Sequence, residues 1–230
     1  MGVEDVQAPL HNIPTNLLSP AECGTMDCER SHDMIPILRD FPHEFETERL
    51  LLRCPLPGDG PRVNEAIWES QESLKQWMPF AVNLPSVEQS EENVRRAHAR
   101  FLLREDLRLH MFRRDTGRFV GSTGLHRMNW EVGRFEIGYW ARSSESGKGL
   151  VTEAVNGIVQ FASDYLDAQR IEIRCDSRND RSRKVAERAG FYLEAVLLQD
   201  EPGVDGVPRD TLIYVRLRLR DGSWGYPTPP

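Results

Sequence analysis

Glu136-Ile137-Gly138-Tyr139-Trp140-Ala141-Arg142-Ser143-Ser144-Glu145-Ser146-Gly147-Lys148-Gly149-Leu150-Val151-Thr152-Glu153 is the stretch that decides the fold of this chain. Its first part is a short apolar run with two aromatic residues, which predicts a buried strand. A polar loop with two glycines follows, and apolar residues then recur at helical spacing as far as Leu166. A loop of this kind presents free backbone N–H groups at the positive end of a helix dipole, and that arrangement binds phosphate.

Two familiar phosphate-binding motifs do not fit this loop. A P-loop needs Gly five residues before Gly147 and Ser or Thr directly after Lys148, where this chain has Arg142 and Gly149. A dinucleotide-binding fingerprint needs Gly or Ala at position 152, where this chain has Thr152. What remains is a Gly-Lys-Gly loop closed by a long amphipathic helix. An ordinary loop that uses Gly for backbone freedom is the structural alternative.

The loop carries a family resemblance. Arg142-x4-Gly147-x-Gly149 resembles the Arg/Gln-x-x-Gly-x-Gly/Ala acetyl-CoA motif of the GNAT acetyltransferase superfamily, with a spacing longer by at least one residue. The next residues, 150–154, are similar to a segment of the branch that acetylates ribosomal-protein N-termini (RimJ/RimL-like). Three further segments resemble that branch in the expected order: Trp77-Met78-Pro79-Phe80, Glu136 to Trp140, and Asn179-x-x-Ser182-x3-Ala186-Glu187-x2-Gly190-Phe191-x2-Glu194. The likeness spans about residues 46 to 218.

The order of elements in the chain predicts a mixed α/β protein. Strands are expected at 50–53, 109–113, 119–125, 135–140, 170–175, 191–198 and 211–219, and helices at 63–74, from Ser86 to about 105, from 150 to about 167, and at 181–189. Ser86 and Gln89 have capping-box spacing, Asp59 is a candidate cap, and His98 is expected to be a packed histidine. The resemblance implies a GNAT fold of the α/β (α+β) class. This fold has a mixed central sheet of about seven strands, flanking helices, and a splayed fourth and fifth strand with the pantetheine arm of acetyl-CoA between them.

The resemblance also implies a cofactor site and a catalytic set. Acetyl-CoA would contact Tyr139, Trp140, Ala141, Arg142, Ser146, Gly147, Lys148, Gly149, Leu150, Val151, Thr152, Asn179, Ser182 and Lys184. Glu136 would accept the proton of the amine, directly or through water. Ser182 would donate a proton to the departing thiolate, and backbone groups near Tyr139 would polarise the thioester carbonyl. The alternatives are that Glu136 faces solvent by strand alternation, and that Asn179 and Ser182 only cap a helix. Basic residues around Lys184 would then form a solvated face.

The acceptor amine is less well specified by the sequence. Trp77, Met78 and Phe80, together with Trp68 and the acidic loop Asp200 to Asp210, are expected to shape its site. A protein α-amino group, a polyamine, an amino sugar and an amino acid all remain candidates, because fold and cofactor motif fix only half of the chemistry. A non-catalytic acyl-CoA sensor is the alternative of a different class, and a nucleotide-binding protein is a weaker one. No spacing of Ser, His and Asp or of Cys and His indicates a covalent intermediate, which favours direct attack by the amine.

Composition sets the remaining bounds. A chain of 230 residues with 39% hydrophobic content can bury one normal core. It has no apolar run of 18 residues and no secretory signal pattern, and its four cysteines lack a disulfide framework, so a cytoplasmic protein with no membrane span is expected. Cys23, Cys28, His32 and Asp33 do not have the common zinc-ligand spacing, so no metal is predicted. The oligomeric state stays open, with a homodimer among the alternatives.

Charge and proline content divide the chain. Residues 1–48 carry a net charge of −8 and the whole chain −7, so residues 49–230 come to +1 and give no support to nucleic-acid binding. Residues 1–44 are punctuated by prolines and are expected to be a partly disordered acidic extension. An acetyltransferase domain is expected over residues 45–220, followed by a loose tail over residues 221–230.

Overall fold

The computed structural model of the chain describes residues 35–226, and every structural statement below concerns that range. Most of the expected N-terminal extension, including Cys23, Cys28, His32 and Asp33, lies outside it. The described part forms one compact unit, which begins at Ile35. None of its helices is both long enough and apolar enough to cross a bilayer.

The unit is built on a nine-stranded sheet with the order β1-β2-β3-β4-β5-β6-β8-β7, and β9 pairs with β8. The strands are β1 (Glu44–Glu46), β2 (Leu50–Arg53), β3 (Leu107–Arg113), β4 (Phe119–Asn129), β5 (Arg134–Ala141), β6 (Arg170–Asp176), β7 (Tyr192–Pro202), β8 (Pro208–Arg218) and β9 (Trp224–Gly225). All neighbours are antiparallel except β5 and β6, which are joined through a helix and run parallel. The mixed sheet predicted from the sequence is therefore confirmed.

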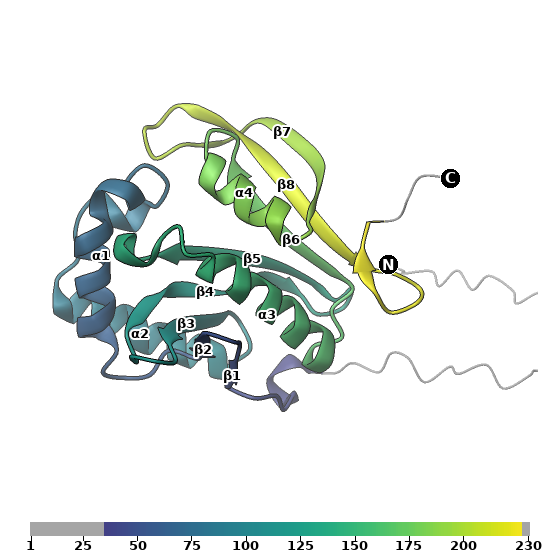
Figure 1. Ribbon diagram of the computed structural model, residues 1–230, viewed down its shortest axis with the longest axis horizontal. Coiled ribbons are helices and arrows are strands. Elements are labelled where there is room, and N and C mark those ends of the chain that lie inside the picture. The colour runs from purple at the N-terminus through teal and green to yellow at the C-terminus, as the bar shows by residue number, and fades with distance from the viewer. Residues whose placement is uncertain (1–34, 227–230) are drawn as a thin grey trace, which may run out of the picture. The chain divides into compact units, whose positions relative to one another are not determined.

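Four helices cover this sheet. They are α1 (Gly60–Leu74), α2 (Val87–Leu102), α3 (Leu150–Tyr165) and α4 (Asp180–Arg188), and short 3-10 turns occur at η1 (Pro36–Leu38), η2 (Pro79–Ala81) and η3 (Ser143–Glu145). In Figure 1, α3 lies in front of β4 and β5, and α4 lies in front of β6 and β8. Helices α1 and α2 pack on the other face, against β4 and β3. The sheet thus separates two layers of helices.

Strands β5 and β6 pair over a short length only. Their register joins Arg134–Glu136 to Arg170–Glu172, and β6 then continues beside β8 as far as Asp176. Beyond Glu136, β5 bonds only to β4. The two strands diverge between α3 and α4 in Figure 1, so the expected splayed strand pair is confirmed.

Alternation along the strands sends side chains into two cores. Ile137 and its neighbours on the α3 face join a large cluster with Ile158 of α3. A smaller cluster on the α1 face contains Val63, Phe112 and Phe119, with the Trp140 ring packed against it. The two faces of β5 therefore lie in different surroundings.

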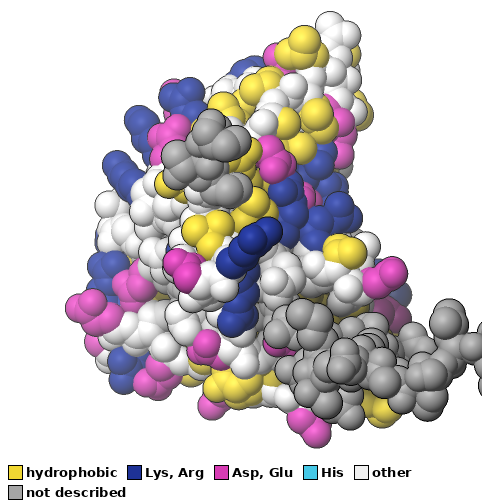
Figure 2. Space-filling model, turned by 90° about the vertical axis from the view of Figure 1, so that its right-hand side faces the viewer, with side chains coloured by type: hydrophobic (Ala, Val, Ile, Leu, Met, Phe, Trp, Pro, Cys, Tyr) yellow, Lys and Arg dark blue, Asp and Glu magenta, His cyan; other side chains and the backbone are white. Residues whose placement is uncertain are grey.

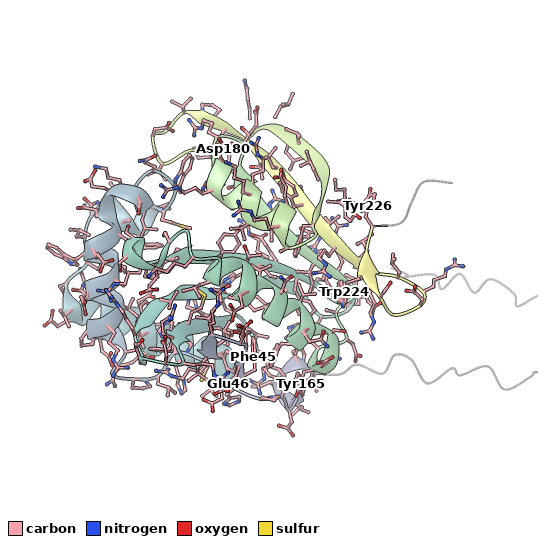
Figure 3. The ribbon with its side chains drawn as sticks, in the orientation of Figure 1. Phe45, Glu46, Tyr165, Asp180, Trp224 and Tyr226 are labelled. Atoms are coloured by element: carbon pink, nitrogen blue, oxygen red, sulfur yellow. The ribbon has the colours of Figure 1, made fainter. Side chains whose placement is uncertain are left out.

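The β1–β2 hairpin is held to α3 by an aromatic contact. The Phe45 ring stacks on Phe161 at 5.0 Å between centroids, and Tyr165 lies 5.2 Å beyond Phe161 (Figure 3). This contact fixes the start of the sheet against the helix that follows the glycine loop.

Two of the local features predicted from the sequence in the first half of the unit are present, and one is not. The Ser86–Gln89 capping box is present at the start of α2, and the His98 ring bonds to the carbonyl of Pro55 at 2.7 Å, so both predictions are confirmed. Asp59 precedes α1 but makes no side-chain cap, because its carboxylate bonds to Arg53, His110 and the backbone of Leu56.

The C-terminal part is more ordered than the sequence analysis expected. Strands β7 and β8 extend to Pro202 and from Pro208, so most of the expected acidic loop belongs to the sheet. Trp224 and Gly225, expected in a loose tail, pair with β8, and the Tyr226 ring lies 5.3 Å from that of Tyr192 (Figure 3). Acidic, basic and hydrophobic side chains are interspersed on the face of the molecule shown in Figure 2.

Candidate active site

The glycine loop turns the chain from β5 into α3. Gly147 and Gly149 have φ values of 76° and 78°, in the left-handed region that side chains rarely adopt. Gly149 is the N-cap residue of α3 and has no side chain to bond to the first turn of the helix. The two glycines therefore shape a loop whose backbone remains accessible at the helix start.

Backbone N–H groups converge at this point. Within the described range, none of the N–H groups of residues 147–152 donates a hydrogen bond to a protein atom. Unpaired donors at a helix N-terminus, together with the helix dipole, form an anion-binding arrangement. The phosphate-binding loop predicted at Ser146 to Thr152 thus has free donors at residues 147–152, whereas the Ser146 N–H donates to the carbonyl of Ser143 at 3.1 Å.

A carboxylate anchors the loop to the first hairpin. Glu153 accepts hydrogen bonds from the Thr47 hydroxyl at 2.6 Å and from the backbone and guanidinium of Arg49 at 2.8 and 2.6 Å. Arg49 also donates to the carbonyl of Lys148 at 3.0 Å. Burial alone would raise the pKa of Glu153, but these bonds outweigh it and lower the pKa. Glu153 therefore fixes the helix start as a structural ion pair.

The Arg142 side chain points away from the loop, contrary to the role expected for it. Its guanidinium, which is buried, bonds to Glu65 and Glu69 of α1, the latter at 2.5 Å. Glu69 also accepts the backbone N–H of Ser144 at 3.0 Å. Burial would raise the pKa of Glu69, but the bonds from Ser144 and Arg142 lower it to about 2. Arg142 joins the loop to α1 instead of facing a diphosphate.

Three other polar side chains of the predicted cofactor set differ in their surroundings. The Lys148 ammonium bonds to the buried carboxylate of Glu145 at 3.0 Å, which holds its positive charge beside the loop. Lys184 is exposed on α4. The Ser146 hydroxyl donates to the carbonyl of Arg142 at 3.2 Å and stabilises the turn.

On the α4 side of β5, Tyr139 and Ser182 form a hydroxyl pair. Their oxygens are 2.9 Å apart, and the Tyr139 hydroxyl also donates to the carbonyl of Ser182 at 3.1 Å. Burial raises the pKa of Tyr139, so its phenol stays protonated. Asn179 caps α4 by accepting the backbone N–H of Ser182 at 3.1 Å, so the Ser182 hydroxyl itself is not used as a cap.

The opposite side of β5 carries the predicted acceptor residues. Trp140 was expected to contact the cofactor with Tyr139, but strand alternation places its ring on the α1 face. There it lies 5.9 Å from Phe80 and 5.8 Å from Phe119, between ring centroids. Trp77 and Met78, half-buried, precede Phe80 and η2. Trp140 thus belongs with the residues predicted for the acceptor.

Glu136 faces the same side of β5 as Trp140. Its side chain is 17% exposed and pairs with Arg127 at 3.3 Å. Burial raises the pKa of Glu136, although the positive charge of Arg127 opposes the change. A carboxyl group with a raised pKa is better suited to accept a proton near neutral pH than an ordinary surface glutamate.

One polar pair on this side was missed by the sequence analysis. His126 lies directly across from Glu136 in the β4–β5 register, and its Nδ1 is 2.7 Å from Oδ2 of Asp106. The ring lies against Gly138, where an added Cβ would be 2.9 Å from Cδ2 and 3.2 Å from Nε2 of the imidazole. His126 and Asp106 are twenty residues apart in the chain, so no local spacing signals the pair.

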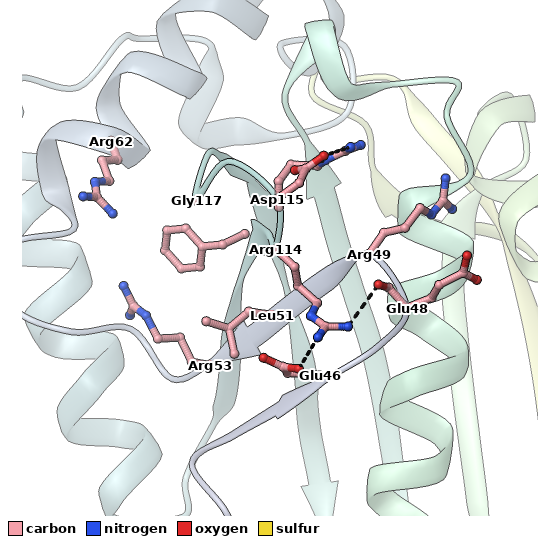
Figure 4. Close-up of a pocket in the computed structure, with 11 residues that line it drawn as sticks. Glu46, Glu48, Arg49, Leu51, Arg53, Arg62, Arg114, Asp115 and Gly117 are labelled. Atoms are coloured by element: carbon pink, nitrogen blue, oxygen red, sulfur yellow. Dashed lines mark hydrogen bonds and ion pairs between the residues drawn. The ribbon is translucent and has the colours of Figure 1, made fainter.

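A cavity of about 640 Å³ lies over β2 and β3, and Arg49, which anchors the glycine loop, is one of its lining residues. It contains several arginines, but Figure 4 shows Arg114 bonded to Glu46 and to the backbone of Glu48, and Asp115 pairs with Arg113. The cavity contains none of the residues predicted for the cofactor, the base or the acceptor. Its volume is therefore no guide to where the chemistry occurs.

Comparisons with known proteins agree with this geometry. Residues 49–192 match the model of the acetyltransferase (GNAT) domain family. The Bacillus subtilis protein YdaF, whose name assigns it provisionally to the ribosomal N-acetyltransferases, is 31% identical over 175 residues, which cover 74% of this chain and 92% of that protein. The ribosomal-protein-serine acetyltransferase of Escherichia coli K12 is 29% identical over 152 residues, covering 62% of this chain and 80% of that protein.

A solved structure shows the same fold. The microcin C7 self-immunity acetyltransferase MccE, determined in complex with acetyl-CoA and AMP, superposes with a TM-score of 0.70 at 23% identity, over 74% of this chain and 93% of that one. The match to the family model confirms the family resemblance drawn from the sequence. Because the family model spans more than half of the chain, the chain belongs to the GNAT acetyltransferase family.

Proposed function

We propose that this protein transfers an acetyl group from acetyl-CoA to a primary amine by direct attack, and that the amine is the α-amino group of a protein N-terminus. The observation that carries the proposal is the set of backbone N–H groups at residues 147–152, which suits a diphosphate and adjoins the splayed end of β5. The names of the two relatives support a ribosomal-protein acceptor.

The chain's residues divide the work between the two sides of β5. Acetyl-CoA, when bound, supplies the thioester whose carbonyl carbon the amine attacks. Glu136 holds a carboxylate on the side of Trp140 and Phe80, where it accepts a proton from the incoming ammonium. The Tyr139–Ser182 pair lies on the other side and donates a proton to the leaving sulfur. Because the base and the proton donor lie on opposite sides of β5, the proton donor does not pass its proton directly to the base.

Most of the predicted glycine loop enters this proposal. The backbone of residues 147–152 would hold the diphosphate, and Lys148 would add a positive charge beside it. Asn179 would act by holding the start of α4, and Ser182 through its hydroxyl. Residues 1–44 are proposed to be an extension that contributes no part of the site, and residues 45–220 the catalytic domain.

The test is the release of free coenzyme A from acetyl-CoA in the presence of a panel of amines. The panel holds a ribosomal-protein N-terminal peptide, the same peptide with its N-terminus blocked and one internal lysine, a polyamine, an amino sugar and an amino acid. Release with the free peptide but not with the blocked one supports the proposal. Release with a small amine alone would assign a small-molecule acceptor. Binding of acetyl-CoA by calorimetry without release for any amine would indicate a non-catalytic acyl-CoA-binding module.

A further inference from the structure

Two protons must leave the acceptor nitrogen during the reaction proposed above, on which this inference rests. An ammonium loses one proton before it can attack and a second as the amide forms, because the product nitrogen keeps only one of its three hydrogens. One proton is recovered by the departing thiolate and the other passes to solvent. Two bases can therefore act on the acceptor side of β5, the side that carries Trp140 and Glu136. Glu136 is one of them.

A second basic group lies beside Glu136. His126 of β4 is its direct cross-strand partner, and partners in an antiparallel pair present their side chains to the same face about 5 Å apart. The register of β4 and β5 shifts just after His126, and Arg127 takes a left-handed φ of 43° there. Such bulges re-aim a neighbouring side chain, and they are frequent next to active sites.

The orientation of the His126 ring is fixed from two directions. Nδ1 lies 2.7 Å from the Asp106 carboxylate, so an Nδ1–H donated to that oxygen leaves Nε2 with its lone pair. The ring rests on β5 at Gly138, where any side chain would meet Cδ2 and Nε2 at 2.9 and 3.2 Å. Cδ2 and Nε2 therefore lie over Gly138, which is midway between Glu136 and Trp140 on the same side of β5.

We propose that His126, held by Asp106, is a second catalytic base on the acceptor side of β5. In one proton transfer the N–H bond of the acceptor nitrogen breaks and an Nε2–H bond forms on His126, while Asp106 stabilises the resulting imidazolium. Glu136 takes the other proton. Of the two protons held by His126 and Glu136, one passes through water to the thiolate and the other to solvent. The transfer therefore requires no oxidant or further reactant.

His126 lies between two carboxylates with charged neighbours of their own. Arg108 of β3 and Arg100 of α2 act on Asp106, and Arg127 of β4 with Arg174 and Glu172 of β6 act on Glu136. Asp106 contacts the ring directly and is the partner whose removal isolates the effect.

The experiment compares His126→Gln, Asp106→Asn and Glu136→Gln by the pH dependence of kcat/KM with one acceptor peptide. Gln at 126 keeps a hydrogen bond to Asp106 but cannot take a proton, so kcat/KM should fall about tenfold to a hundredfold near neutral pH and recover at high pH, where the amine is already free. Asp106→Asn should also lower kcat/KM, because the imidazolium formed in the proton transfer loses the carboxylate that stabilises it and the ring loses the partner that orients it. In the double variant His126→Gln, Glu136→Gln, the rate should follow only the fraction of free amine.

His98→Gln is the matched control. His98 is also half-buried and bonded through Nδ1, but to the carbonyl of Pro55 beneath α2. A His126→Gln profile that coincides with that of His98→Gln would overturn the second base and leave acetyl transfer intact. A loss in His126→Gln that is equal at every pH and confined to KM would also overturn it, since it would assign the ring to binding. A wild-type protein that binds acetyl-CoA but releases no coenzyme A with any amine would overturn the proposed function and this role together.

Discussion

Replacement of Gly149 by Asp should abolish acetyl-CoA binding while the domain stays folded. Gly149 has a φ of 78°, and a side chain in the left-handed region costs about 1–2 kcal/mol. An added Cβ would meet only Arg49, at 3.6 Å, which is an ordinary contact. The free energy of unfolding should therefore decrease only by the cost of placing a side chain in the left-handed region. The melting temperature should fall by about 2–4 °C for each kcal/mol lost.

The effect on binding should be much larger. The new carboxylate would stand among N–H groups proposed to hold a diphosphate, and would repel it. Each lost hydrogen bond to a charged group is worth about 1.5–3 kcal/mol, so losing two weakens binding by about 3–6 kcal/mol. Since 1.4 kcal/mol is about tenfold in affinity, the Kd should rise by more than about a hundredfold.

Calorimetry with acetyl-CoA measures this change, and Gly117→Asp is the matched control. Gly117 lies in the β3–β4 turn with a φ of 66° and nothing within 4 Å of an added Cβ. Asp at this position should therefore cause a similar loss of backbone stability, but outside the proposed phosphate-binding loop. The control should lose a similar amount of stability and keep the wild-type Kd. A folded Gly149→Asp protein that binds with the wild-type Kd would refute the assignment of the loop, as would equal losses of binding in both variants.

Three further outcomes are expected. Ser182→Ala should lower kcat by about tenfold to a thousandfold with little change in the Kd for acetyl-CoA, because a thiolate donor acts late in the reaction; an unchanged kcat with a lowered melting temperature would assign Ser182 to the helix instead. Removal of residues 1–34 should leave the Kd unchanged, whereas a cut extended through Arg39 should also lower the melting temperature, because Arg39 bonds to the end of α3; loss of binding in the shorter truncation would contradict this. Glu69→Gln should reduce the free energy of unfolding most above pH 4.5, and the difference from wild type should shrink as pH falls toward 2, since a carboxyl with a lowered pKa contributes stability only while it is ionised; a difference that is constant with pH in chemical unfolding would rule this out.

The sequence was sufficient where the signal was local or periodic. The apolar repeat of α3, the Ser86–Gln89 capping box and the glycine loop depend on residues close together in the chain, and the structure bears out each. The family resemblance supplied the splay of β5 and β6, which no propensity encodes.

The failures involve the direction in which a side chain points. Arg142 belongs to the motif that resembles an acetyl-CoA loop, yet Glu65 and Glu69, more than seventy residues earlier in the chain, hold its guanidinium on α1. Trp140 follows Tyr139, but alternation places the two on opposite sides of the strand. The His126–Asp106 pair depends on the register of β4 against β5 and on a bulge. Such features arise only when distant segments meet, so spacing alone cannot reveal them.

The short pairing of β5 with β6 has a consequence for how the protein unfolds. Three residue pairs join β1–β5 to β6–β8–β7 within the sheet, and α3 on the first half packs against α4 on the second. Without ligand, amide hydrogens on the facing edges of the divergent strands should exchange with solvent early, and the C-terminal half should open as a separate cooperative unit. A ligand arm that bonds to both edges would act as an added strand and make the halves unfold together, so that occupancy would raise cooperativity as well as the melting temperature.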